Sequence, residues 1–212
     1  MELFSHTIDL FAWIYMIGIV FIVSYLIGSI PTGYIIVKIK TGEDIRKTGS
    51  GSTGATNVKR ILGTKYFFIV MILDAIKGIL PVILAAMFAT FKSEFGIPPV
   101  IAAIGVILGH SKSLFLNFKG GKSVATGVGT IIALNWQVGL IIAAIWGAVT
   151  YFTKYVSVGS IIAVICAPLL MFHFQMPGMY VLYCVVGAIY IIYLHRENIK
   201  RLLKGEENKV RK

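Results

Sequence analysis

Acidic side chains, and charged side chains in general, are scarce in this sequence. It has nine aspartates and glutamates against 20 lysines and arginines, and charged residues make up only 14% of its 212 positions. Soluble globular domains carry about 25% charged residues, so this deficit excludes an ordinary soluble domain. The basic excess, a net charge of +11, needs an explanation of its own.

Cysteine is almost absent. Cys166 and Cys184 are the only two, and both lie within apolar runs. Such cysteines are usually small buried free thiols, so disulfide, metal and redox chemistry find no support. We therefore expect neither a metal site nor a cofactor.

Apolar residues are abundant instead. They make up 57% of the chain, and the mean hydropathy is +0.84. These values predict an all-α polytopic membrane protein, which we treat as a single domain over 1–212. The first nine residues carry no basic side chain, and no small-residue cleavage site follows the first apolar run. We therefore expect no cleavable signal peptide.

Apolar runs of membrane length are separated by polar clusters and predict about seven transmembrane helices, with six or five as alternatives. The first run is long for one crossing, roughly 45 Å as a helix against about 30 Å of hydrocarbon, so tilt, interfacial extension or a kink at Pro31 would absorb the excess. The fourth is short and, with the fifth, forms two short spans or a helical hairpin. The runs lie at about 10–39, 66–91, 97–116, 124–136, 138–153, 157–175 and 178–194.

Basic residues gather on one side of these predicted spans. All of the 20 except Lys77 and Lys92 fall on the side of the loop at about 40–65, which also holds the loop at 112–123 and the tail at 195–212. By the positive-inside rule this side is cytoplasmic, with the N-terminus outside and the C-terminus inside. The net charge is then a juxtamembrane feature that does not require nucleic acid. We expect residues 204–212 to be solvated or to contact anionic lipid.

Residues 49–57 have no bulky apolar side chain. Three glycines give an anion close access to backbone N–H groups, and four hydroxyls and one amide add hydrogen-bonding groups. Arg46 and Lys47 precede this stretch, and Lys59 and Arg60 follow it. Together these features predict a binding loop for a phosphorylated molecule.

Three further polar clusters fall on the same predicted side. Asp74 and Lys77 are three residues apart in a span, so they can form an ion pair that either fixes helix packing or contacts substrate. Residues 117–123 place two lysines around a Gly-Gly pair, but a Walker A loop is excluded because position 116 is leucine. His195 and Asn198 share a helix face at the inner end of the last span. These clusters together predict one anion site at the membrane surface.

The ordered motifs resemble those of the bacterial acyl-phosphate-dependent glycerol-3-phosphate acyltransferases, the PlsY family, from about residue 28 to residue 209. The resemblance rests on Gly-Ser-Ile-Pro at 28–31, Asp-Ile-Arg at 44–46, Gly-Ser-Gly-x-x-Gly-Ala-Thr-Asn at 49–57 with Arg60, Asp-x-x-Lys-Gly at 74–78, Gly-His at 109–110, Phe-Lys-Gly-Gly-Lys at 118–122 with Val-Ala-Thr at 124–126, His-Arg-Glu-Asn-Ile at 195–199, and Gly-x-Glu-x-Lys at 205–209. The chain departs from the family pattern at Ser52, where asparagine is usual, at Lys112 and Ser113, where Phe-Pro is usual, and at Ser123, where glycine is usual.

The resemblance implies transfer of a fatty acyl group from acyl phosphate to the 1-hydroxyl of glycerol 3-phosphate, giving lysophosphatidic acid and inorganic phosphate at the bacterial inner membrane. Glycerol 3-phosphate, a long-chain acyl phosphate and membrane lipid are then the partners, and the enzyme that forms acyl phosphate is a candidate partner. Cationic loops suit two phosphorylated substrates, and the mixed anhydride already carries a good leaving group.

Motif matching also implies roles for individual residues. His195, Asn198 and Lys122 are the catalytic candidates; His195 as general base is a hypothesis, and a substrate phosphate oxygen is the alternative proton acceptor. The implied phosphate-binding residues are Ser50, Gly51, Ser52, Asn57, Arg60, Lys119, Gly120, Gly121 and Lys122. The implied supporting residues are Arg46, Asp74, Lys77 and Thr126.

Two other functions compete with this assignment. Acyltransferases with a His-x-x-x-x-Asp motif are excluded, because no histidine here is followed by aspartate five positions on. A transporter of organic phosphates would use similar cations, although transporters place their site near the membrane midplane. Release of inorganic phosphate by the purified protein discriminates between the enzyme and the transporter.

Overall fold

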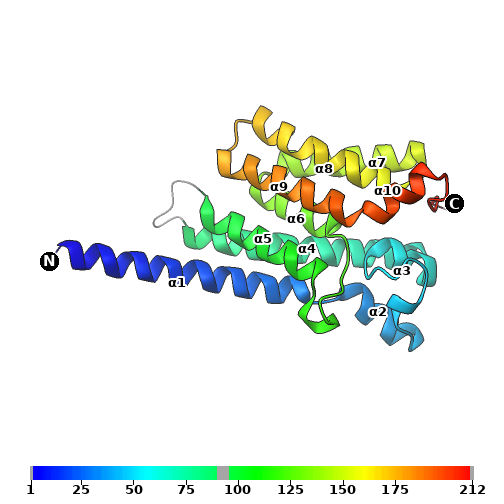
Figure 1. The fold of residues 1–212 in the computed structure, drawn as a ribbon, viewed down its shortest axis with the longest axis horizontal. Helices are drawn as coiled ribbons and strands as arrows, with labels where there is room; N and C mark the ends of the chain where they lie inside the picture. The colour runs from blue at the N-terminus through cyan, green and yellow to red at the C-terminus, as the bar shows by residue number, and fades with distance from the viewer. Residues whose placement is uncertain (1, 90–95, 211–212) are drawn as a thin grey trace.

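The computed structural model describes residues 2–89 and 96–210, which form ten α-helices, two short 3₁₀ helices and no strand (Figure 1). The last two positions of the predicted second span, Lys92 and residues 211–212 lie outside the described residues. The α-helices are α1 (Glu2–Ser29), α2 (Thr32–Thr41), α3 (Ala55–Leu62), α4 (Thr64–Ala89), α5 (Ile97–Ser111), α6 (Val124–Leu134), α7 (Trp136–Thr153), α8 (Val156–His173), α9 (Gly178–Leu194) and α10 (Arg196–Leu203). The 3₁₀ helices are η1 (Ile45–Lys47) and η2 (Leu114–Leu116).

The all-helical membrane fold is confirmed, and the number of spans agrees with the alternatives of five or six rather than with seven. Among the described residues, five helical stretches are long and apolar enough to cross a membrane, and α9 with α10 makes a sixth if that pair, bent by 58°, counts as one span. Helix α6 has 11 residues. At 1.5 Å per residue it covers roughly half of a hydrocarbon core of about 30 Å, which is why it cannot cross alone.

The predicted first span is interrupted at residues 29–31. Helix α1 ends at Ser29 and α2 begins at Thr32, with Pro31 between them. Proline has no backbone N–H and disfavours helical geometry in the residue before it, so the helical hydrogen-bond ladder stops here. The break turns α2 away from the axis of α1 (Figure 1).

Small residues allow the helices to pack closely. A Cβ on Gly109 of α5 would overlap the Tyr25 carbonyl oxygen of α1, and one on Gly129 of α6 would overlap the Ala75 carbonyl oxygen of α4. Membrane helices lack a hydrophobic driving force toward one another, so such close backbone contact supplies much of their packing. The pairs α1–α5, α4–α6, α7–α8 and α8–α9 are therefore neighbours.

The polar segments gather at one end of the bundle. Helices α2, α3 and α10 and the C-terminus lie at the end far from the N-terminus (Figure 1). This end carries residues 49–57, which connect η1 to α3, and the loop between α5 and α6 that contains residues 119–123. The predicted phosphate-binding loops therefore meet at one end of the helices.

Candidate active site

Residues 49–57 form a loop that is organised around one buried amide. The Asn57 side-chain N–H groups donate to the carbonyl oxygens of Ile45 (3.2 Å), Thr48 (2.9 Å) and Ser52 (2.9 Å). Its side-chain oxygen accepts from the Ser50 backbone N–H at 3.0 Å. Both the amino group and the oxygen of this amide therefore bond to backbone groups within residues 45–52. Asn57 borders the cavity described below, but the structure places it as the organiser of the loop.

The Arg46 side chain is bound by the neighbouring carboxylate of Asp44. Its guanidinium makes a bidentate pair with Asp44, with Nη2 2.6 Å from Oδ2 and Nε 2.9 Å from Oδ1. The hydrogen bond from Arg46 lowers the pKa of the Asp44 carboxyl to about 2. The guanidinium also lies 5.4 Å from the centre of the Tyr34 ring. Arg46 thus stabilises the turn before the loop.

A cavity of about 360 Å³ joins segments from across the chain. One wall is polar and is built from the loop at 49–57, the loop between α5 and α6, and the α9–α10 junction. The predicted site residues on this wall are Ser50, Ser52, Asn57, Arg60, Asp74, Lys122, His195 and Asn198. The structure therefore brings together eight residues that are spread over 149 positions, from 50 to 198.

Other predicted site residues lie outside this lining. Among the described residues, Arg46, Gly51, Lys77, Lys119 and Thr126 do not line the cavity, and neither do Gly120 and Gly121. Lys119 is exposed on the surface. Gly120 and Gly121 pack against His110, where a Cβ on either would overlap its carbonyl oxygen or its ring nitrogen Nε2. The two glycines shape the loop that presents Lys122.

Lys122 is half-buried in the polar wall, and its ammonium donates to the Asn198 side-chain oxygen. Burial is the largest cause that lowers the pKa of Lys122, and together with the positive charges of Arg201 and Arg60, opposed by Glu207, it brings this pKa to about 8. A positive charge that is poorly solvated and only partly compensated gains much from an anion. Lys122 is therefore a strong candidate for contacting a phosphate.

His195 is buried at the junction of α9 and α10, with 3% of its surface exposed. Its Nδ1 lies 2.8 Å from the Ile191 carbonyl oxygen. A carbonyl oxygen only accepts, so Nδ1 carries the proton and Nε2 of the neutral ring carries a lone pair. The ring lines the cavity and can accept a proton there.

The C-terminal segment supplies a residue that the sequence patterns did not assign to the site. The Glu207 carboxylate accepts from Ser157 (3.0 Å), from the Asn198 amide (2.6 Å) and from Arg201 Nε (2.7 Å). Burial alone would raise the pKa of Glu207, but these hydrogen bonds bring it below its ordinary value. The expectation that residues 204–212 are solvated or lipid-bound is therefore wrong for Glu207, whose position in the Gly-x-Glu-x-Lys motif was the available signal.

The rest of the cavity lining is mainly apolar. It is formed by α4, α6, α7 and α8, which contribute mainly aliphatic and aromatic side chains. Members of this apolar part are Phe67, Met71, Ile72, Ala75, Val124, Val128, Ala143, Trp146, Gly147 and Val156. One cavity thus combines cationic, hydrogen-bonding groups with apolar side chains, which suits an amphiphilic molecule with an anionic head.

These features define an integral membrane protein with a cavity that is lined by both cationic and apolar side chains. A family model described as "Glycerol-3-phosphate acyltransferase" matches residues 18–205. The chain belongs to this family, and the protein is an acyltransferase.

Relatives and solved structures agree with this assignment. The glycerol-3-phosphate acyltransferase of Nostoc sp. is 44% identical over 211 residues, covering 93% of each chain. That of Synechococcus sp. (strain JA-3-3Ab) is 44% identical over 188 residues, covering 88% of this chain and 89% of the other. The glycerol 3-phosphate form of the integral membrane enzyme PlsY (YgiH) is 39% identical with a TM-score of 0.86, covering 92% of this chain and 96% of that one. Its lysophosphatidic acid form is 37% identical with a TM-score of 0.82, covering 92% of this chain and 95% of that one.

Proposed function

We propose that this enzyme transfers a fatty acyl group from acyl phosphate to the 1-hydroxyl of glycerol 3-phosphate and releases lysophosphatidic acid and inorganic phosphate. The observation that carries the proposal is one cavity that is lined by both cationic and apolar side chains. Two structures of the related PlsY are described as its glycerol 3-phosphate form and its lysophosphatidic acid form. These two molecules are the acceptor and the product that we propose for this enzyme.

Phosphate binding falls to the polar wall. Ser50, Arg60 and Lys122 line the cavity from the loop at 49–57, from helix α3 and from the loop between α5 and α6, respectively. Lys122 and Arg60 supply positive charge, while Ser50 adds a hydroxyl. Asn198 fixes Lys122, and Glu207 fixes Asn198, so the cation is held before substrate arrives. Such preorganisation lets the site stabilise charge without rearrangement during the reaction.

The chemical step needs no cofactor. The 1-hydroxyl oxygen of glycerol 3-phosphate attacks the acyl carbonyl carbon and forms the ester bond, while the bond from that carbon to the phosphate oxygen breaks. The hydroxyl proton goes to His195 Nε2 or to an oxygen of the departing phosphate. Because acyl phosphate is a mixed anhydride, positioning and charge neutralisation provide most of the catalysis.

The test is an assay of purified protein with acyl phosphate and glycerol 3-phosphate. We expect equal amounts of inorganic phosphate and lysophosphatidic acid. Lys122→Ala should lower kcat/KM by about 100-fold, because a buried charge-assisted contact is lost. Lys47→Ala, an exposed lysine outside the cavity, is the matched control. No phosphate release, with uptake of phosphate into vesicles instead, would overturn the proposal in favour of a transporter.

The placement of the site in the cell follows from the charge pattern. We infer that the polar end faces the cytoplasm of a bacterial inner membrane, with the N-terminus outside, since lysines and arginines concentrate at that end. Cytosolic glycerol 3-phosphate and a soluble enzyme that forms acyl phosphate would then have direct access. Labelling of Lys47→Cys by a membrane-impermeant maleimide should occur only after inside-out vesicles are prepared; labelling of intact cells would reverse the orientation.

A further inference from the structure

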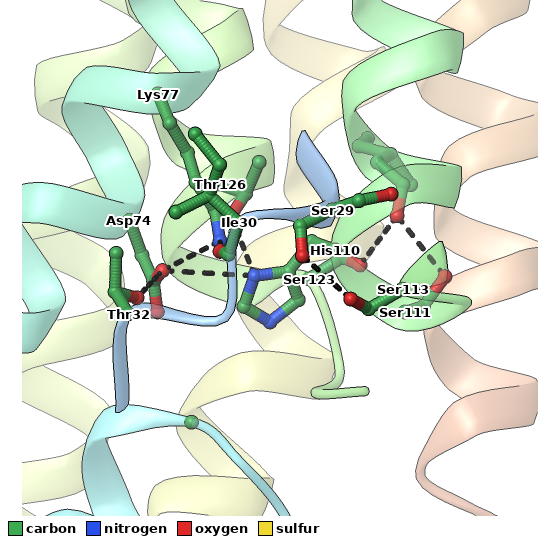
Figure 2. Close-up of polar contacts among 12 residues, drawn as sticks. Ser29, Ile30, Thr32, Asp74, Lys77, His110, Ser111, Ser113, Ser123 and Thr126 are labelled. Atoms are coloured by element: carbon green, nitrogen blue, oxygen red, sulfur yellow. Dashed lines mark hydrogen bonds and ion pairs between the residues drawn. The ribbon is translucent and has the colours of Figure 1, made fainter. Parts of the chain in front are cut away.

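The break between α1 and α2 leaves backbone carbonyls that side chains from two other segments satisfy. Lys77 of α4 donates to the Ile30 carbonyl oxygen at 2.9 Å. Ser113, in the loop between α5 and α6, donates to the Ser29 carbonyl oxygen at 2.5 Å. Figure 2 shows both contacts beside the short stretch of backbone that connects α1 to α2. The break is therefore a junction of three parts of the chain.

A single carboxylate oxygen lies at the centre of this junction (Figure 2). Asp74 Oδ1 is 2.8 Å from Lys77 Nζ and 3.7 Å from His110 Nδ1, and it accepts from the Thr32 hydroxyl. Asp74, Lys77 and His110 expose 1%, 7% and 7% of their surfaces. Buried charges persist only when they are paired and hydrogen-bonded, so this geometry is strongly constrained.

One arm of the junction leads to the loop at 49–57. Thr32 begins α2, and the next residue, Gly33, lies against the carbonyl oxygen of Thr53 so closely that a Cβ would overlap it. Thr53 is buried within the loop itself. A shift of Thr32 relative to Asp74 would therefore move the loop that carries Ser50.

The other arm leads to the loop that carries Lys122. The His110 carbonyl oxygen accepts from the Gly121 N–H at 3.1 Å, and the His110 ring lies against Gly121. Its Nδ1 is 3.2 Å from the Thr126 hydroxyl, in the first turn of α6. The position of the His110 ring between Asp74 and Thr126 therefore fixes the backbone just before Lys122.

We infer that Asp74 is a positioning residue that sets the separation of the two phosphate-binding loops, acting through Thr32 on one and His110 on the other. Lys77 neutralises the carboxylate, so it can border an anion site without repelling the anion. The phosphate-binding role of the loops rests on the proposed function, but the separation of the loops does not.

The first experiment measures that separation without substrate. Spin labels are attached to cysteines introduced at two exposed positions, Lys47→Cys and Lys119→Cys, in a protein that also carries Cys166→Ser and Cys184→Ala. Pulsed electron paramagnetic resonance then gives the distribution of distances between the two labels. Thr32→Val removes the hydroxyl and keeps the shape, while Thr32→Ser keeps the hydroxyl. We expect a broadened or shifted distribution for Thr32→Val and an unchanged one for Thr32→Ser. An unchanged distribution for Thr32→Val would overturn the inference.

The second experiment asks whether the displaced loops bind phosphate less well. Assayed well below the melting temperature, Thr32→Val should raise KM for glycerol 3-phosphate by about 10-fold, as expected for loss of one hydrogen bond to a charged group, and Thr32→Ser should restore it. A purely structural role would lower the melting temperature of Thr32→Val and leave KM unchanged. Removing the Asp74 carboxylate alone leaves Lys77 buried and unpaired, and an asparagine oxygen would still accept from the Thr32 hydroxyl, so the double variant Asp74→Leu with Lys77→Met is the second probe. It should broaden the distance distribution as Thr32→Val does, and a narrow, unshifted distribution would also contradict the inference.

Discussion

At the scale of single residues, the site depends on a few side chains whose neighbours determine their charge and direction. Lys122 illustrates this, because the Asn198 oxygen and the surrounding burial fix both its position and its proton affinity. We therefore expect anion binding to depend on the charge state of Lys122.

A pH dependence follows from the lowered pKa of Lys122. With a pKa of about 8, the ammonium is charged at pH 7, and it loses its proton as the pH rises through about 8. We expect KM for glycerol 3-phosphate to rise above that pH, since the neutral amine no longer attracts phosphate. Lys122→Arg keeps the charge throughout this range and should remove the alkaline rise. An identical rise in KM for both proteins would assign the effect to another group.

Three departures from the family pattern can be explained at the same scale. Ser123 has φ +59°, a left-handed conformation that favours glycine, and its hydroxyl donates to the Ile107 carbonyl oxygen at 2.9 Å. Ser113, where proline is usual, donates to the Ser29 carbonyl oxygen. Ser52 contributes its hydroxyl as acceptor for the Gly54 N–H at 3.4 Å. Each serine hydroxyl thus makes a hydrogen bond to a backbone group.

At the scale of elements, the segment after α10 completes the polar wall. It returns to the corner between α7 and α8, where the Val210 N–H donates to the Lys154 carbonyl oxygen at 2.8 Å. Glu207 lies in this segment and connects α8 to α10 through Ser157 and Asn198. The segment is therefore a structural part of the site.

Glu207→Gln tests this role of the segment. The amide cannot accept from Ser157, Asn198 and Arg201 together, because one of its two positions is a donor. Loss of hydrogen bonds to a charged acceptor should reduce kcat/KM by about 10- to 100-fold and lower the melting temperature. Glu206→Gln, at the exposed neighbouring position, is the matched control and should behave as wild type. Equal effects of the two substitutions would show that only the net charge of the segment matters.

Helices α4 and α7 border the apolar part of the cavity, and Gly147 on α7 offers a way to shorten it. A Cβ on Gly147 would meet no atom within 4 Å, so a larger side chain fits without disturbing the helices. Gly147→Leu should raise KM for long acyl phosphates by about 10-fold while short ones are still used, since part of the apolar contact is blocked. Gly18→Leu on α1, which also has open space but does not line the cavity, should leave the chain preference unchanged. A uniform loss of activity with all chain lengths would argue against an acyl site there.

At the scale of the whole molecule, the arrangement of helices brings polar loops to one end and an apolar wall beside them. Hydropathy predicted the membrane class and most helix positions, because apolar runs report directly on where a chain can be buried in lipid. It overcounted the spans, because a run of apolar residues such as α6 can pack inside the bundle without crossing. Composition cannot distinguish these two ways of burying a short helix.

The sequence by itself determined the membrane character, the concentration of cations on one side and the motifs of the family. These properties depend on residue type and on neighbours within a few positions, where hydropathy and loop-forming glycines act locally. The loop at 49–57, with its glycines and hydroxyls, could be predicted for the same reason. The inward use of the Asn57 amide could not, because its partners depend on how the loop closes.

Only the tertiary structure decided which distant residues meet. Thr32 reaches Asp74 across 42 positions, Lys122 reaches Asn198 across 76, and Ser157 reaches Glu207 across 50. Such pairs follow from close helix packing through glycines such as Gly109 and Gly129, which no local pattern specifies. Burial then makes each polar group require a partner, so packing determines both the contacts and the electrostatics of the site.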